Sequence, residues 1–162
     1  MKPKNGKKSI RKLSFRSWKS FAEQFGLSIG EGRRVVTLGD KKNERFNVDA
    51  ETKRMISSIK SDAMFAGNPL GRNTGKGFIP SLWSIDMAAQ SDMAKKITLD
   101  KRSAWLFLCG RDIFASSLED ERPEKDYVFP MNEQGENLGI GFFDGKMIIN
   151  LMDKGDFLRR EG

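Results

Sequence analysis

The residues of this chain that are best suited to chemistry are basic side chains beside glycines and turns. Gly110-Arg111-Asp112 follows an apolar run, and an earlier glycine-rich stretch carries Arg72 and Lys76. Cations and backbone amides at such places bind phosphate groups. The residues that we single out here as candidate phosphate contacts are Arg72, Lys76, Arg111, Lys154, Arg159 and Arg160. Ordinary turn chemistry is an equal alternative at Arg111, and solvated ion pairs are the alternative for the last three.

The stretch from Gly71 to Gly77 resembles a nucleotide-binding P-loop only superficially. Three residues separate Gly71 from Gly75, where the phosphate-binding loop needs four. Gly77 follows Lys76, where a hydroxyl group should hold magnesium. We therefore expect no nucleotide site. The stretch is either a loop that presents Arg72 and Lys76 to a phosphate backbone or a plain surface loop.

The composition argues against enzymatic chemistry. The chain has no histidine, the commonest general base and metal ligand, and it has one cysteine, Cys109. A lone cysteine cannot build a thiolate metal site, and without a histidine nothing obvious activates it. We expect Cys109 to be a small buried hydrophobic residue. We predict no catalytic residue, no metal site and no cofactor.

The positive charge is concentrated at the N-terminus. Residues 1–19 contain eight Lys or Arg and no acidic residue, so subtracting eight from the net charge of +7 leaves −1 for residues 20–162. The rest of the chain can bind a polyanion only through local basic patches. We find no stretch apolar enough to cross a membrane, and one cysteine fits a reducing, intracellular location.

The elements that must position these residues indicate an α+β fold in three segments. We expect a basic arm at 1–10, an α/β domain with a mostly antiparallel sheet at 11–92, and a β pseudo-barrel at 93–162. In the first domain we predict helices at 14–25 and 50–60, capped by Ser14 and Asp49, and strands at 33–38 and 44–48. We expect the apolar residues of the second helix, Met55, Ile56 and Ile59, to face inward.

The C-terminal third reads as a set of short strands. Trp105–Leu108 is apolar throughout and is predicted as a strand, with helical turns after Asp112. Strands at 127–131 and 137–143 form a predicted hairpin, and Asp144-Gly145 predicts a tight turn into the next strand. Gly139 and Gly141 indicate barrel curvature, or room for a nucleic-acid backbone.

In its order of motifs, the chain resembles a known family. Phe107-Leu108-Cys109-Gly110, Leu138-Gly139-Ile140-Gly141 and the terminal DKGDFLRRE are similar to a PUA domain, a small pseudo-barrel that binds RNA. Residues 11–160 resemble ribosome-biogenesis factors of the Nip-seven type. Upstream, Arg11-Lys12-Leu13-Ser14, Gly67–Arg72 and Ile85-Asp86 carry this resemblance. The segment between Phe143 and Ile148 is shorter than in longer family members.

The resemblance implies a non-catalytic RNA-binding protein that acts in rRNA processing and large-subunit biogenesis. It implies RNA contact by basic residues of the PUA domain, which by position are Arg111, Lys146, Lys154, Arg159 and Arg160. It also implies ribosome assembly proteins as partners of the N-terminal domain, and a monomer. The location would be cytoplasmic, or nucleolar in a eukaryote. An RNA-targeting partner of a modifying enzyme and a protein-interaction module are the other two interpretations.

Overall fold

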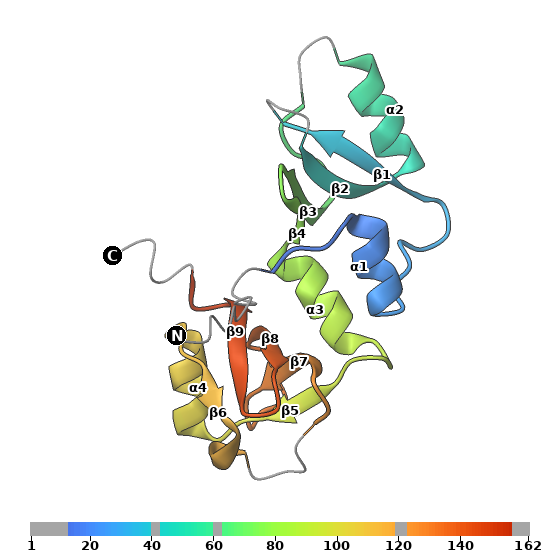
Figure 1. Cartoon of the computed structure of the whole chain (residues 1–162). Coiled ribbons are helices and arrows are strands. Elements are labelled where there is room, and N and C mark those ends of the chain that lie inside the picture. The colour runs from blue at the N-terminus through green and yellow to red at the C-terminus, as the bar shows by residue number, and fades with distance from the viewer. Residues whose placement is uncertain (1–12, 40–42, 60–62, 119–122, 157–162) are drawn as a thin grey trace, which may run out of the picture. The chain divides into compact units, whose positions relative to one another are not determined.

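The computed structural model describes residues 13–39, 43–59, 63–118 and 123–156 (Figure 1). The predicted basic arm, Arg159 and Arg160 lie outside these ranges. The contacts divide the chain into two compact units, one of residues 14–96 and one that comprises Leu13 and the residues from 97 onward. The predicted α+β fold class is confirmed, since each unit combines a sheet with helices.

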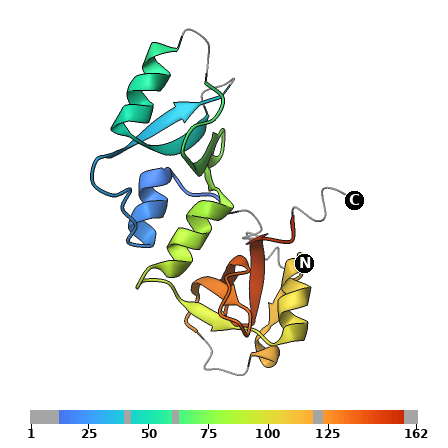
Figure 2. The same ribbon diagram turned by 180° about the vertical axis from the view of Figure 1, so that it is seen from behind.

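The sheet of the first unit has four strands in the order β1-β2-β3-β4. They are β1 Arg33–Leu38, β2 Glu44–Asp49, β3 Asn68–Thr74 and β4 Gly77–Pro80, and each pairs antiparallel with the next. The helices are α1 Trp18–Gln24, α2 Ala50–Ser58 and α3 Leu82–Gln90. Helix α2 lies along β1 and β2 (Figure 2).

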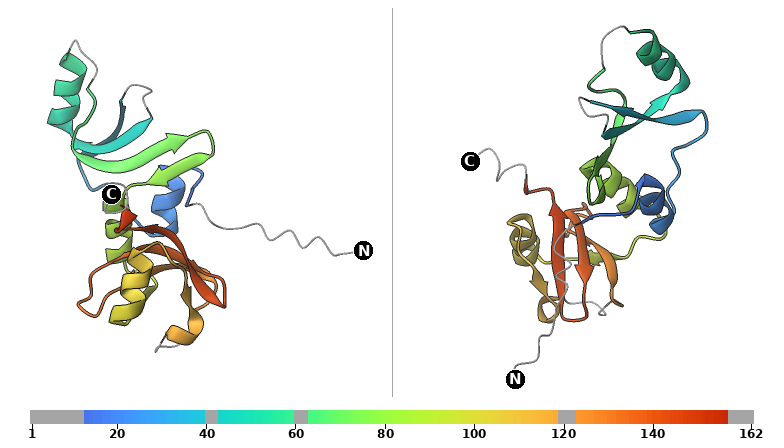
Figure 3. Two further views of the ribbon diagram at one scale, coloured as in Figure 1. Left: turned by 90° about the vertical axis from the view of Figure 1, so that its left-hand side faces the viewer. Right: turned by 45° about the horizontal axis from the view of Figure 1, so that its top comes forward.

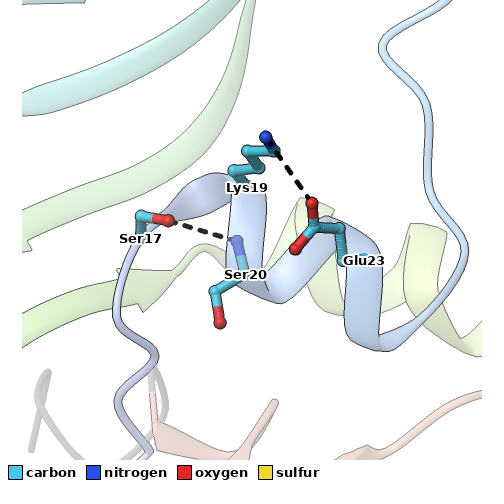
Figure 4. A network of polar contacts seen from close by, with 4 residues as sticks. All are labelled: Ser17, Lys19, Ser20 and Glu23. Carbon is cyan, nitrogen blue, oxygen red and sulfur yellow. Dashed lines mark hydrogen bonds and ion pairs between the residues drawn. The ribbon is translucent and has the colours of Figure 1, made fainter.

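Helix α1 begins three residues later than predicted. Ser17, not Ser14, is the N-cap, and its Oγ accepts a hydrogen bond from the amide of Ser20 at 3.1 Å (Figure 4). The chain is extended before this point because the Phe15 amide and carbonyl pair with those of Phe78 at 2.8 and 2.7 Å. Lys19 and Glu23, one helical turn apart, form an ion pair at 3.8 Å on the exposed side of the helix (Figure 4).

An aromatic cluster forms much of the core of this unit. Phe21 and Phe78 are fully buried, and the ring of Phe21 lies 4.9 Å from that of Phe15 and 5.7 Å from that of Trp18. Edge-to-face contacts of this kind stabilise a core beyond the area that they bury. These aromatic residues therefore hold α1 on its own unit.

The sequence predicts a loop for the glycine-rich stretch, and this is wrong. Residues 67–77 are mostly strand β3 and the turn that follows it. Gly71 has φ +138°, and a Cβ there would lie on the carbonyl oxygen of Ile79 and 2.8 Å from Cα of Pro80. Glycine is therefore required so that β3 and β4 can approach each other. Strand β4 is at the edge of the sheet, which explains why it tolerates Pro80.

The second unit has a five-stranded sheet in the order β5-β7-β8-β9-β6. The strands are β5 Lys96–Thr98, β6 Ile113–Phe114, β7 Asp126–Met131, β8 Gly139–Phe143 and β9 Met147–Asp153, and a short 3₁₀ turn, Ala115–Ser117, follows β6. The predicted hairpin of β7 and β8 and the turn into β9 are present. The register of β8 against β9 shifts at Gly141, which curls the sheet.

Trp105–Leu108 belongs to a helix, so the strand predicted there is wrong. Helix α4, Lys101–Leu108, begins after Asp100, whose carboxylate accepts a hydrogen bond from the Ser103 amide at 2.6 Å. It lies beside β9 and β6 (Figure 3). Its buried residues are Ser103, Ala104 and Phe107, and Phe107 packs into a core that includes Val128, Phe143 and Ile148.

Candidate nucleic-acid interface

Helix α4 presents a basic and aromatic face to solvent. Its buried residues lie on one side, and at about 100° per residue Trp105 lies nearly opposite them. Lys101 and Arg102, one turn earlier, are exposed as well. The hydrogen bonds that Asp100 accepts from Ser103, with a smaller effect of the nearby Arg102 charge, hold the pKa of Asp100 below its usual value. Asp100 is therefore ionised at neutral pH and fixes the start of this face.

Arg111 follows the end of α4 and is exposed. The amides of Cys109, Gly110 and Arg111 donate to the carbonyls of Trp105, Phe107 and Leu106, at 2.9 to 3.0 Å. Gly110-Arg111-Asp112 thus ends one helix rather than opening another, and the backbone-amide phosphate site that we considered there is absent. An arginine at a helix C-terminus is favourable, and its guanidinium is the group left for a phosphate.

Asp112 fastens this turn to the sheet. We predict that helical turns begin after it, but Asp112 caps no helix. Its Oδ1 accepts a hydrogen bond from the amide of Asn150 at 2.9 Å, and Asn150 donates to the carbonyl of Phe107 at 2.7 Å. Residues 112 and 150 are far apart in the sequence. These bonds hold the end of α4 beside the middle of β9.

The edge strand β6 connects Arg111 to Lys146. Phe114 pairs with Met147, and the amide of Ala115 donates to the carbonyl of Lys146 at 2.9 Å. Ala115 is four positions after Arg111, so the Cα atoms of these two residues are at most about 14 Å apart. We call the four exposed cations of α4, its C-terminal turn and the start of β9 the α4–β6 rim: Lys101, Arg102, Arg111 and Lys146.

Lys146 lies in a turn with a fixed geometry. The Asp144 carboxylate accepts hydrogen bonds from the amides of Met147 and Lys146, at 2.9 and 2.8 Å. These bonds, and then the charges of Lys125 and Lys146, lower the pKa of Asp144. Lys125 is also exposed and lies over Gly145, where its Nζ would be 4.0 Å from an added Cβ. No sequence pattern singles out Lys125, because it lies 19 positions before Asp144, the first residue of the turn.

The other candidate residues lie elsewhere. Lys154 is half-buried just beyond the far end of β9, so at about 3.3 Å per residue it lies roughly 25 Å from Lys146. Arg72 on β3 and Lys76 in the following turn are exposed on the first unit. Thr74 orders that turn, because its Oγ1 accepts from the Lys76 amide at 3.2 Å. The structure thus places Lys154 far from Lys146 along β9 but near the end of α4 that Arg111 follows, because Gly155 lies against the carbonyl of Leu108.

The largest differences from our predictions concern Cys109 and two aromatic residues. Cys109 is exposed at the end of α4, so the prediction that it is buried is wrong. Trp105 is 65% exposed and Phe114 is 61% exposed, although our predictions placed neither at a binding surface. If the residues after Asp100 are interpreted as a helix with Ala104 and Phe107 facing inward, Trp105 falls on the exposed side.

Two further observations limit the chemistry of the described part of the chain. Its cysteine, aspartate and glutamate residues nowhere gather in groups of three that could hold a metal ion. None of its helices is long and apolar enough to span a membrane.

Comparison with known proteins identifies the second unit. Residues 95–162 match the model of the UPF0113 PUA domain. A UPF0113 protein of Archaeoglobus fulgidus is 30% identical over 169 residues, which cover 95% of this chain and 90% of that protein. A conserved PUA domain protein from Thermoplasma acidophilum has a similar fold, with a TM-score of 0.53 and 18% identity, over 89% of this chain and 90% of that one.

Proposed function

This chain belongs to the UPF0113 family and carries its PUA domain, and on that premise we propose that it is an RNA-binding protein without catalysis of its own. PUA domains typically bind RNA. We further propose that its RNA is pre-rRNA or large-subunit rRNA and that it acts in rRNA processing and large-subunit biogenesis. This finer assignment rests on the resemblance to the Nip-seven type described above.

The observation that carries the proposal of RNA binding is the α4–β6 rim. Lys146 is far from the other three cations in the sequence, and the pairing of Ile113 with Ile148 sets its turn alongside the strand that follows Arg111. The net charge outside residues 1–19 is −1, so this concentration of positive charge is local. Phosphate contacts of this kind supply affinity and fix the orientation of the RNA.

The proposal that the chain has no catalysis of its own rests on its lack of histidine, the position of its cysteine and the pKa shifts of its aspartates. The chain has no histidine, and its one cysteine is an exposed residue that ends α4. Three aspartates of the described residues have shifted pKa values: Asp49, Asp100 and Asp144. All three are shifted downward, mainly by hydrogen bonds from backbone amides, as in caps and turns. A general acid at neutral pH needs the opposite shift.

Crosslinking in cells followed by RNA sequencing tests the proposal. We expect large-subunit rRNA or its precursor to be enriched, and the α4–β6 rim to carry the crosslinked peptides. Enrichment of other RNAs would contradict the role in large-subunit biogenesis while leaving RNA binding intact. Enrichment of no RNA would contradict RNA binding itself.

A second candidate function concerns the first unit, which carries exposed apolar side chains that our predictions placed inward. Met55 and Ile59 are 59% and 50% exposed, and α2 contains no fully buried residue. Ile56, by contrast, packs against the cluster of Leu38, Phe46 and Val48. Phe65 is 67% exposed, although its ring lies 4.9 Å from that of Phe46. Such a surface favours a protein partner, which we propose to be a ribosome assembly protein.

The variant Met55→Ser/Ile59→Ser tests this second function. Both side chains are exposed, so the fold should tolerate the change. We expect the variant to leave pre-ribosomal particles during sedimentation while it binds purified RNA as the unchanged protein does. Unchanged association with the particles would rule out a role for this surface.

A further inference from the structure

We propose that Trp105 stacks on an unpaired RNA base, and hence that the α4–β6 rim takes single-stranded rather than double-helical RNA. This inference rests on the proposed RNA binding and names its substrate class. Phe114, beside Lys146, would take a second base in the same way.

Trp105 contributes little to the core of the PUA unit. Its exposed fraction is 65%, whereas Phe107 on the opposite side of the helix is fully buried and supplies the contact with the core. Trp18 shows what a structural tryptophan looks like in this chain: it is 8% exposed, with its ring 5.7 Å from Phe21 and 6.0 Å from Phe78. The indole of Trp105 thus offers a broad π surface to whatever approaches α4.

The cations around Trp105 determine which ligand fits. Lys101 and Arg102 precede it by four and three residues, which places their Cβ atoms about 5–6 Å from that of Trp105 on the same helix face. Arg111 follows at the end of the helix, where its amide is held by the carbonyl of Leu106. A nucleotide has both a flat base for the indole and a phosphate for these cations.

The same combination recurs at the neighbouring edge strand. Phe114 is 61% exposed, and the next residue, Ala115, is bonded to the backbone of Lys146 at 2.9 Å. The rim therefore alternates cations with aromatic side chains along two elements. This alternation is typical of surfaces that bind single strands, because bases stack on the rings while the backbone follows the charges. An apolar protein partner would leave the four cations without counterparts.

The geometry favours an unpaired base. In a double helix both faces of each base are covered by its neighbours, so an indole on a helix surface finds only the backbone and the groove edges. In a single strand a base can turn out and lie on the ring. The rim should therefore distinguish the two forms of RNA even though both carry phosphates.

Tryptophan fluorescence of the full chain tests the proposal directly. In a Trp18→Phe/Trp83→Phe background Trp105 is the only tryptophan, since the chain has three. We expect a short oligouridine to quench its emission, and the same oligouridine annealed to complementary oligoadenylate to leave it nearly unchanged. Quenching of equal size by both forms would overturn the preference for unpaired bases.

Two substitutions separate stacking from apolar contact. Trp105→Leu keeps an apolar side chain without a π face, and we expect it to weaken oligouridine binding roughly 5- to 100-fold. Trp105→Phe keeps the π face and should retain most of the affinity. Both replace an exposed side chain, and a urea midpoint equal to that of the unchanged protein shows that the fold is intact.

The outcomes distinguish failure of this inference from failure of the proposed function. If Trp105→Leu binds oligouridine as tightly as Trp105→Phe does, stacking is wrong while RNA binding stands. If the unchanged protein binds neither form of RNA, the proposed function fails and this inference fails with it. If RNA-free ribosomal protein quenches Trp105 and RNA does not, the indole serves a protein partner, which also overturns the proposal.

Discussion

Neutralising Arg111 and Lys146 together should halve the salt dependence of RNA binding. Each phosphate contact made to a single strand contributes about −0.7 to the slope of log affinity against log salt. If all four cations of the α4–β6 rim make such a contact, the slope is about −2.8, and Arg111→Gln/Lys146→Gln should bring it to about −1.4. Both side chains are exposed, so the substitution changes charge and leaves the core untouched.

The matched control is Lys53→Gln/Arg54→Gln on α2. It removes one lysine and one arginine, both exposed, from the first unit, and so lowers the net charge equally. Fluorescence anisotropy with labelled oligouridine, at about 50 to 400 mM salt, gives the affinities and the slopes. We expect the control to keep the slope of the unchanged protein. An equal fall in slope for both variants would mean that only overall charge matters, and no fall for the rim variant would remove the rim from the interface.

The absolute slope also tests whether the basic N-terminal segment binds RNA. Eight Lys or Arg residues lie within residues 1–19, and if all of them engaged a single strand they would add about −5.6 to the slope. A slope near −3 therefore assigns binding to the rim alone, and a slope near −8 assigns most of it to the N-terminal segment. A slope near zero would contradict electrostatic binding by either.

Three further predictions concern stability, which urea unfolding measures. Gly139→Ala should cost about 2–4 kcal/mol, because Gly139 has φ +147° and a Cβ would lie on the carbonyl oxygen of Met152. Gly135→Ala, at φ +78° with open space around it, should cost about 1–2 kcal/mol. Equal losses would contradict the close approach of β8 to β9. Ser81→Ala should cost about 2 kcal/mol, because Ser81 caps α3 and its hydroxyl also donates to the carbonyl of Pro69 at 2.6 Å. Ser17→Ala removes the cap of α1 and should cost about 1 kcal/mol. Folding lowers the pKa of Asp144 from 3.8, so the stabilising effect of its carboxylate is present above that pH and is lost as the pH falls through the lowered value. Asp144→Asn should therefore lose less stability in acid than the unchanged protein does. Identical losses would contradict the hydrogen bonds of the turn.

The elements predicted correctly are those with a local signal. Asp144-Gly145 forms its turn because the aspartate accepts from amides two and three residues ahead, and Asp49 caps α2 through the Thr52 amide at 2.7 Å. These interactions lie within a few residues of each other, so residue types at fixed spacing are enough to predict them.

The errors arise where distant contacts decide the structure. Trp105-Leu106-Phe107-Leu108 has no period that separates a strand from a helix, and the cap at Asp100 decides it. The glycines of residues 67–77 look like a loop in isolation, yet Gly71 is required by the approach of Ile79 and Pro80 on the next strand. No local pattern reveals which strand will lie alongside.

The candidate site illustrates both cases. A basic residue beside a turn is enough to predict Arg111, and the family resemblance implies Lys146, but 35 positions separate them, and only the pairing of β6 with β9 brings their segments side by side. The strand predicted at Trp105–Leu108 also concealed the ligand class, because it gave no reason to place Trp105 at a binding surface. As part of α4, the same residue becomes the exposed centre of a basic face, and a surface read only as a set of phosphate contacts becomes one that can hold a base.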